Sequence, residues 1–177
     1  MKKFGVSIIF LVMFMLIYFL QVGVFSHLQI AGVMPNLFVI LILYIGLFAN
    51  SINAIVFGII IGLFLDLLYG NTVGISAVMF CIIGYLGAYF DKNFSKENKV
   101  TILLMVIGAT IIYELGFYAL NGFILRYDFE WFKLMRIIIF EVIYNSLITI
   151  LLYPLIQNTG HKIDRIFKKN NVLTRYF

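Results

Sequence analysis

Long apolar runs separated by short polar stretches make up most of this chain. Between Phe4 and Leu65 there is no Asp, Glu, Lys or Arg. Because one bilayer crossing takes about 20 residues, this run of about 60 residues holds two or three spans. The pattern therefore indicates a protein whose solvent is largely lipid.

Polar and turn-forming residues divide the chain into six apolar segments, each a candidate transmembrane helix. They are residues 6–24, 30–49, 52–69, 73–90, 100–120 and 137–156. Pro35-Asn36 interrupts the second segment and leaves an apolar stretch only about 20 Å long as a helix, although proline is tolerated in a first helical turn. We expect an all-α integral membrane protein, a bundle of six transmembrane helices.

The basic residues distinguish five crossings from six and also give the orientation. Six crossings place ten Lys and Arg on the side of the termini and three on the other; five crossings give five and eight. Because cytoplasmic loops carry the excess of Lys and Arg, six crossings with both termini cytoplasmic is the prediction. Residues 1–160 then form the polytopic membrane domain, and residues 161–177 form a basic cytoplasmic tail.

Composition and charge support this assignment and narrow the classes of partner that the protein can bind. Apolar residues make up 63% of the chain and charged residues 12%, whereas soluble domains have about 45–50% and about 25%. The net charge is +5, and five of the basic residues follow the last apolar segment. A basic tail beside a membrane is typical of contact with lipid headgroups, so no nucleic-acid partner is expected.

The sequence carries no recognisable catalytic or cofactor-binding motif. It contains no P-loop, no dinucleotide-binding glycine pattern, no nucleophile elbow and no zinc-protease motif. Its one cysteine, Cys81, excludes disulfides and cysteine zinc sites within the chain. His27 and His161 fall at opposite faces of the expected topology. We therefore expect no enzyme, no cofactor and no metal site.

Three acidic residues lie within the apolar segments: Asp66, Glu114 and Glu141. An ionised carboxylate at the bilayer centre costs about 2.5–3.5 kcal/mol, so such residues are functional candidates. Asp66 and Glu141 lie about one turn from a segment end, whereas Glu114 lies deeper. Hydrogen bonding between helices and the handling of an ion or substrate both remain open for each residue.

A second pattern combines small residues with one of these acids. The members, at four-residue intervals, are Gly58, Gly62, Asp66, Gly70 and Gly74. Residues four apart share a helix face, and glycines on that face let a second helix approach closely in lipid. The expected partner is either the following segment, where Gly84 and Gly87 offer a smooth surface, or another protein.

The loop Asn121–Arg136 is placed on the outer side and is rich in aromatic residues, among them Tyr127, Phe129, Trp131 and Phe132. Such a cluster is typical of an interfacial aromatic belt. Docking of a partner protein is the alternative.

The glycine pattern resembles that of a known family, the bacterial rod shape-determining protein MreD. The match comprises Gly58, Gly62, Leu63, Asp66, Gly70 and Gly74, preceded by Pro35-Asn36, and covers roughly residues 35–90. The resemblance implies a non-catalytic component of the cell-elongation machinery in the bacterial inner membrane. The partners that it implies are MreC, the MreB cytoskeleton and a RodA-type polymerase with its transpeptidase.

A second class of protein shares this architecture. The substrate-binding component of an energy-coupling-factor vitamin transporter also has six spans and a similar length. Such importers typically present an Ala-x-x-x-Ala face on the first span, and Val6–Val24 contains no alanine. The sequence therefore favours the cell-shape function, with import as the alternative and an orphan membrane protein as a third possibility.

Overall fold

The computed structural model describes residues 2–69, 72–126 and 130–168, and within them the chain is helical without a β-strand. The six α-helices and one π-helical turn are α1 (Lys2–Leu20), η1 (Gln21–Phe25), α2 (Leu37–Phe48), α3 (Ser51–Tyr69), α4 (Ile75–Asn93), α5 (Lys99–Leu125) and α6 (Trp131–Lys168). The expected all-α class is confirmed.

Five of these helices are long and apolar enough to cross a membrane, but α2 is not. The expectation of a membrane-length helix over residues 30–49 is therefore corrected. Only 12 of those residues are helical, and at 1.5 Å per residue α2 is about 18 Å long, against about 30 Å of hydrocarbon. Pro35 and Asn36 precede the first turn, and Ala49-Asn50 follows the last one.

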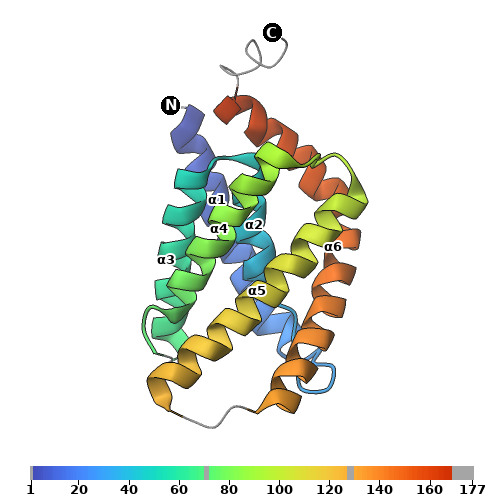
Figure 1. The fold of residues 1–177 in the computed structure, drawn as a ribbon. Coiled ribbons are helices and arrows are strands. Elements are labelled where there is room, and N and C mark those ends of the chain that lie inside the picture. Colours follow the sequence, from blue (N-terminus) through green and yellow to red (C-terminus); the bar gives the residue numbers. More distant parts are fainter. Residues whose placement is uncertain (1, 70–71, 127–129, 169–177) are drawn as a thin grey trace.

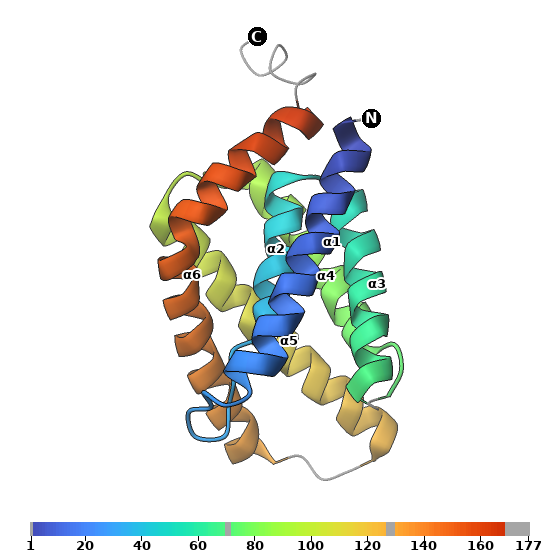
Figure 2. The ribbon, with the colours of Figure 1, turned by 180° about the vertical axis from the view of Figure 1, so that it is seen from behind.

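The short helix α2 occupies the centre of the bundle, and all of its residues are buried. It contacts each of the other five α-helices. Figure 1 shows α4 and α5 on one side of α2, and Figure 2 shows α1 on the opposite side. A helix that is apolar all round is expected in such an interior position.

The chain runs up and down through the bundle, so that α1 begins and α6 ends at the same end of the molecule (Figures 1 and 2). The connections α2–α3 and α4–α5 lie at this end as well, whereas α3 and α5 end at the opposite end of the bundle. The short α2 therefore leads the chain from one end of the bundle to the other.

Glycines bring α2, α3 and α4 into backbone contact. A Cβ atom at Gly58 would lie 2.8 Å from the carbonyl oxygen of Phe80, and one at Gly62 would overlap the backbone of Ala77. On the other side of α4, a Cβ at Gly87 would lie 2.6 Å from the carbonyl oxygen of Leu43. The glycines thus allow van der Waals contact between backbones, a principal source of helix attraction in lipid.

The last helix, α6, extends beyond the apolar segment 137–156 at both ends and includes residues 161–168 of the expected tail. Its final turns lean over the end of the bundle (Figure 2). Ile163 is buried in the core, and Gly160 lies against the ring of Phe48, where a Cβ would approach to 2.5 Å. This part of α6 therefore covers the carboxyl end of α2.

Candidate functional site

The two ends of the buried helix α2 carry the main polar clusters of the described structure. A helix end leaves backbone N–H or C=O groups without intrahelical partners, and in lipid the protein itself must satisfy them. Because α2 ends inside the bundle, side chains from other elements are needed at both of its ends.

At the amino end, amide side chains from η1 and α6 bind the backbone. The Asn36 backbone N–H donates to Oδ1 of Asn145 at 2.9 Å, and the Leu37 N–H donates to Oε1 of Gln21 at 3.2 Å. Asn36 also caps α2, because its side chain accepts from the Val39 N–H. The side-chain nitrogen of Gln21 donates to the Pro35 carbonyl at 2.5 Å. This end is therefore held by neutral groups.

The preceding segment has an unusual backbone that places Gln21 at this junction. Gln21 begins the π-helical turn η1, and π-helical turns are frequent at functional positions. In the following loop, Ala31 has a left-handed φ of 54°, next to Gly32 at 75°. A non-glycine residue in this region is strained and persists where the surroundings fix it.

The same cluster extends into the interface between α5 and α6. Asn145 donates to the Thr110 hydroxyl at 2.9 Å and to the Glu141 carboxylate at 3.5 Å. The carboxyl group of Glu114 lies next to that of Glu141. The structure therefore brings Glu114 and Glu141 together, and both Asn145 and Glu141 are buried.

A cavity of about 180 Å³ lies beside this cluster. Its walls come from α2 to α6, from η1 and from the loop before α2. The lining residues are Gln21, Met34, Pro35, Asn36, Phe38, Leu65, Tyr69, Ser76, Phe80, Tyr113, Phe117 and Glu141. Met34 and Tyr69 are partly exposed, so the cavity reaches the surface at the end of the bundle opposite the chain termini.

Asp66 lies next to the cavity and binds the backbone at the start of α4. Its fully buried carboxylate accepts the Gly74 N–H at 2.8 Å and the Ser76 N–H at 3.2 Å. These groups lie at the start of α4, where the helix dipole favours a negative charge. Asp66 therefore caps α4 within the same chain.

One glycine of the expected helix face, Gly74, differs from Gly58 and Gly62. Gly74 lies beyond the end of α3 and has a φ of 104°, a conformation that glycine adopts without steric cost. Its place in the sequence is thus explained by the turn and not by a shared face with Gly62. Gly70 lies outside the described residues.

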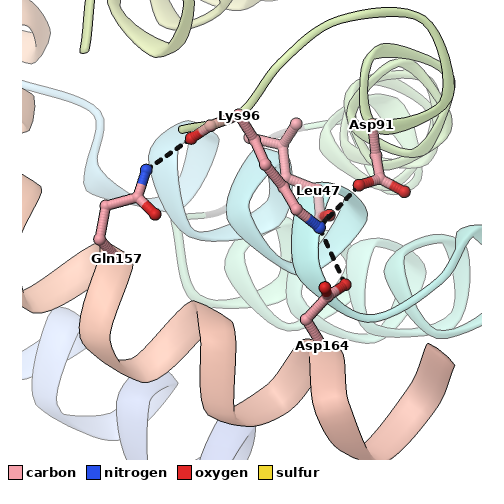
Figure 3. A network of polar contacts seen from close by, with 5 residues as sticks. All are labelled: Leu47, Asp91, Lys96, Gln157 and Asp164. Carbon is pink, nitrogen blue, oxygen red and sulfur yellow. Dashed lines mark hydrogen bonds and ion pairs between the residues drawn. The ribbon is translucent and has the colours of Figure 1, made fainter. Parts of the chain in front are cut away.

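The carboxyl end of α2 is bound by a charged residue. Lys96, in the loop between α4 and α5, donates to the Leu47 carbonyl of α2 at 3.3 Å (Figure 3). Its ammonium also pairs with Asp91 and with Asp164, each at 2.8 Å. A cation at this position complements the negative end of the helix dipole. Lys96 thus joins α2, α4 and α6.

Contacts from α6 fix the loop that carries Lys96. Gln157 donates to the Lys96 carbonyl at 2.5 Å (Figure 3), and the Tyr153 hydroxyl donates to the Glu97 carbonyl at 2.6 Å. The Lys96 ammonium also lies 4.9 Å from the centre of the Phe48 ring, which favours it through a cation–π interaction. These contacts pack the loop against the carboxyl end of α2.

Sequence reasoning missed the residues that hold α2. Gln21 and Asn145 are amide residues inside apolar segments. Because an amide side chain within the membrane is costly unless it is hydrogen-bonded, the sequence could have marked both residues as contacts between helices. In the sequence, Lys96 counted only as one of the basic residues that indicate the orientation in the membrane. No sequence signal pairs it with Asp164, because the two are far apart in the chain.

The remaining candidates lie elsewhere. No group of His, Cys, Asp or Glu among the described residues has metal-site geometry. Of the aromatic loop, Tyr127 and Phe129 lie outside the described residues, whereas Trp131 and Phe132 begin α6 and are exposed. Tyr118 accepts the Glu130 N–H through its hydroxyl at 3.0 Å, which ties the start of α6 to α5.

Comparison with known families decides the classification. A family model described as rod shape-determining protein MreD matches residues 1–160. The chain belongs to the MreD family. This confirms the resemblance drawn from the glycine pattern, and the matched range includes both ends of α2 and the cavity. Searches among curated proteins and among solved structures give no match.

Proposed function

We propose that this protein is a non-catalytic scaffold of the cell-elongation machinery, located in the bacterial inner membrane. Membership of the MreD family carries a role in rod shape determination, within a cell-shape machinery that includes MreC and MreB. Its five long apolar helices make it a multi-pass membrane protein. MreC is the direct partner in this proposal, with MreB and a RodA-type polymerase with its transpeptidase as further partners.

The scaffold role is supported by what the buried polar groups do. Asp66 accepts backbone N–H groups of α4, and Lys96 binds two carboxylates and a carbonyl oxygen. Gln21 and Asn145 bind the backbone at the start of α2. These contacts fix helices relative to one another, which is what a rigid docking frame requires.

The size of the cavity favours a scaffold over a vitamin importer. Sites for drug-sized ligands are about 300–1,000 Å³, whereas this cavity holds about 180 Å³. The first span also lacks the alanine face of such importers, because residues 6–24 contain no alanine. Both observations count against vitamin import.

The proposal places both termini and the α4–α5 loop in the cytoplasm. The structure suggests a better labelling site than Lys96, which is bound in the cluster of Figure 3. Lys92 is exposed on the last turn of α4. In a Cys81→Ser background, Lys92→Cys should resist a membrane-impermeant maleimide in whole cells and react after permeabilisation. Labelling in intact cells would overturn the orientation.

Depletion in a rod-shaped bacterial host tests the function. Loss of the protein should make the cells wider and rounder, because lateral wall synthesis loses its organisation. Purification of the tagged full chain should recover MreC. Unchanged cell width after depletion, together with tight binding of a vitamin by the purified protein, would contradict the scaffold role and favour import.

A further inference from the structure

The cavity beside the start of α2 is a built polar site whose lining contains an acid. Its polar wall includes Glu141 and Ser76, both buried, and the hydroxyl of Tyr113, which lies near Ser76 and Asn36. Among the described residues that line it there is no Lys, Arg or His. The basic residues described near this end of the bundle, Arg126, Lys133 and Arg136, are exposed.

The acid in the wall belongs to a pair. Glu114 of α5 lies next to Glu141, and an ionised carboxylate only accepts hydrogen bonds. Glu141 is buried, so its ionised form needs a partner. A buried charge is costly unless it is paired, and one cation in the cavity would neutralise it.

We propose that the cavity binds the primary ammonium group of a small amine. An ammonium has three donors and no acceptor, which suits a wall that offers the Glu141 carboxylate and the hydroxyls of Ser76 and Tyr113. The rings of Phe80, Tyr113 and Phe117 form a stacked row in the same wall. A quaternary ammonium would leave these acceptors unpaired.

The volume limits the ligand to a small group. About 180 Å³ corresponds to roughly six water molecules, at about 30 Å³ each. Ethanolamine fits this space, either as the free amine or as the headgroup of phosphatidylethanolamine. Both sources present the same ammonium, and the opening between Met34 and Tyr69 provides the path to it.

Binding is measured on the purified full chain with two probes. Labelled ethanolamine is used in equilibrium dialysis with the detergent-solubilised protein, and choline is the competitor. In the second arm, the protein is reconstituted in nanodiscs of phosphatidylglycerol with or without phosphatidylethanolamine, and retained lipid is identified by native mass spectrometry. Saturable ethanolamine binding is expected, with choline weaker by about tenfold or more because it has no N–H donor.

Two variants connect binding to the cavity. Glu141→Gln removes the charge with little change of shape and should weaken ammonium binding by about tenfold or more. Met34→Trp changes an exposed residue at the opening, leaves all polar groups in place, and should block access with an unchanged melting temperature. Glu97→Gln is the matched control, because Glu97 is exposed at the opposite end of the bundle.

The outcomes separate the sources and decide the proposal. Retention of one phosphatidylethanolamine, lost in both variants, identifies the lipid as the source; saturable binding of free ethanolamine alone identifies a soluble amine. Absence of both in the wild-type protein would overturn the site, as would equal binding by Met34→Trp and wild type. None of these results depends on MreC or on cell shape.

Discussion

The two ends of α2 solve the same problem with different chemistry. At the amino end, neutral amides of Gln21 and Asn145 bind the backbone, and a cavity lies beside them. At the carboxyl end, the Lys96 ammonium binds the Leu47 carbonyl and two carboxylates, and aromatic packing fills the space. The backbone at one end is bound by neutral side chains beside a cavity, whereas the backbone at the other end is bound within a packed cluster of ions.

The difference follows from where charge is tolerated. Side chains of the Lys96 cluster remain partly exposed, with fractions of 15% for Lys96 and 27% for Asp164, so they keep part of their hydration. Asn145 is fully buried, where a full charge would cost several kcal/mol. Amides supply hydrogen bonds there without that cost. The two ends should therefore respond differently to substitution and to salt.

The largest effect is expected where α2 itself is displaced. In Gly46→Ala, the added Cβ would lie 2.5 Å from the Gly84 carbonyl oxygen and 2.9 Å from the Ala88 nitrogen, both backbone atoms. We expect loss of the folded, monodisperse protein in size-exclusion chromatography. The matched control is Gly108→Ala, where nothing lies within 4 Å of the new Cβ; it should fold as well as the parent. A well-folded Gly46→Ala protein would contradict the backbone contact.

The ionic end should be the next most sensitive. Lys96→Met leaves Asp91 and Asp164 facing each other without their cation, and we expect a loss of about 1–3 kcal/mol in the free energy of unfolding. Adding Asp91→Asn to this variant should restore part of the lost stability. The exposed Lys92→Met is the control. Thermal unfolding at low and high salt measures the effect, which should shrink with salt because the pairs are partly hydrated.

Substitutions at the amino end of α2 should lower the free energy of unfolding by less, and this loss should not depend on salt. Asn145→Leu removes the bonds to the Asn36 backbone and to Thr110, and we expect a loss of about 1–2 kcal/mol. Asn158→Leu on the exposed side of the same helix is the control. A loss that varies with salt as strongly as that of Lys96→Met would remove the distinction between the two ends.

The smallest effect is expected for Asp66→Asn, at a residue that caps α4 outside both clusters. Asp66→Asn keeps an oxygen acceptor for the Gly74 and Ser76 N–H groups, so the loss should stay below about 1 kcal/mol. Asp66→Ala removes the acceptor and should cost about 1–2 kcal/mol. Thermal unfolding of the two variants side by side is the measurement. Complete loss of assembly with Asp66→Asn would instead indicate that its charge has a function.

Local sequence determined which parts of this chain are helices in lipid. The apolar runs that give α1, α3, α4 and α5 are continuous, and Pro35-Asn36 marks the start of α2 because proline fits a first turn and asparagine caps it. The Gly58 to Gly74 pattern also sufficed for the family, which the match to residues 1–160 shows.

Tertiary structure alone decided which apolar helix is central. Both α1 and α2 are apolar all round, yet α1 faces outward over much of its length and α2 is completely buried. Lipid chains are as apolar as a protein core, so hydropathy does not distinguish the two environments. The pairs Glu114–Glu141 and Lys96–Asp164 likewise arise only when distant segments pack together. Their geometry depends on helix packing, which no local pattern encodes.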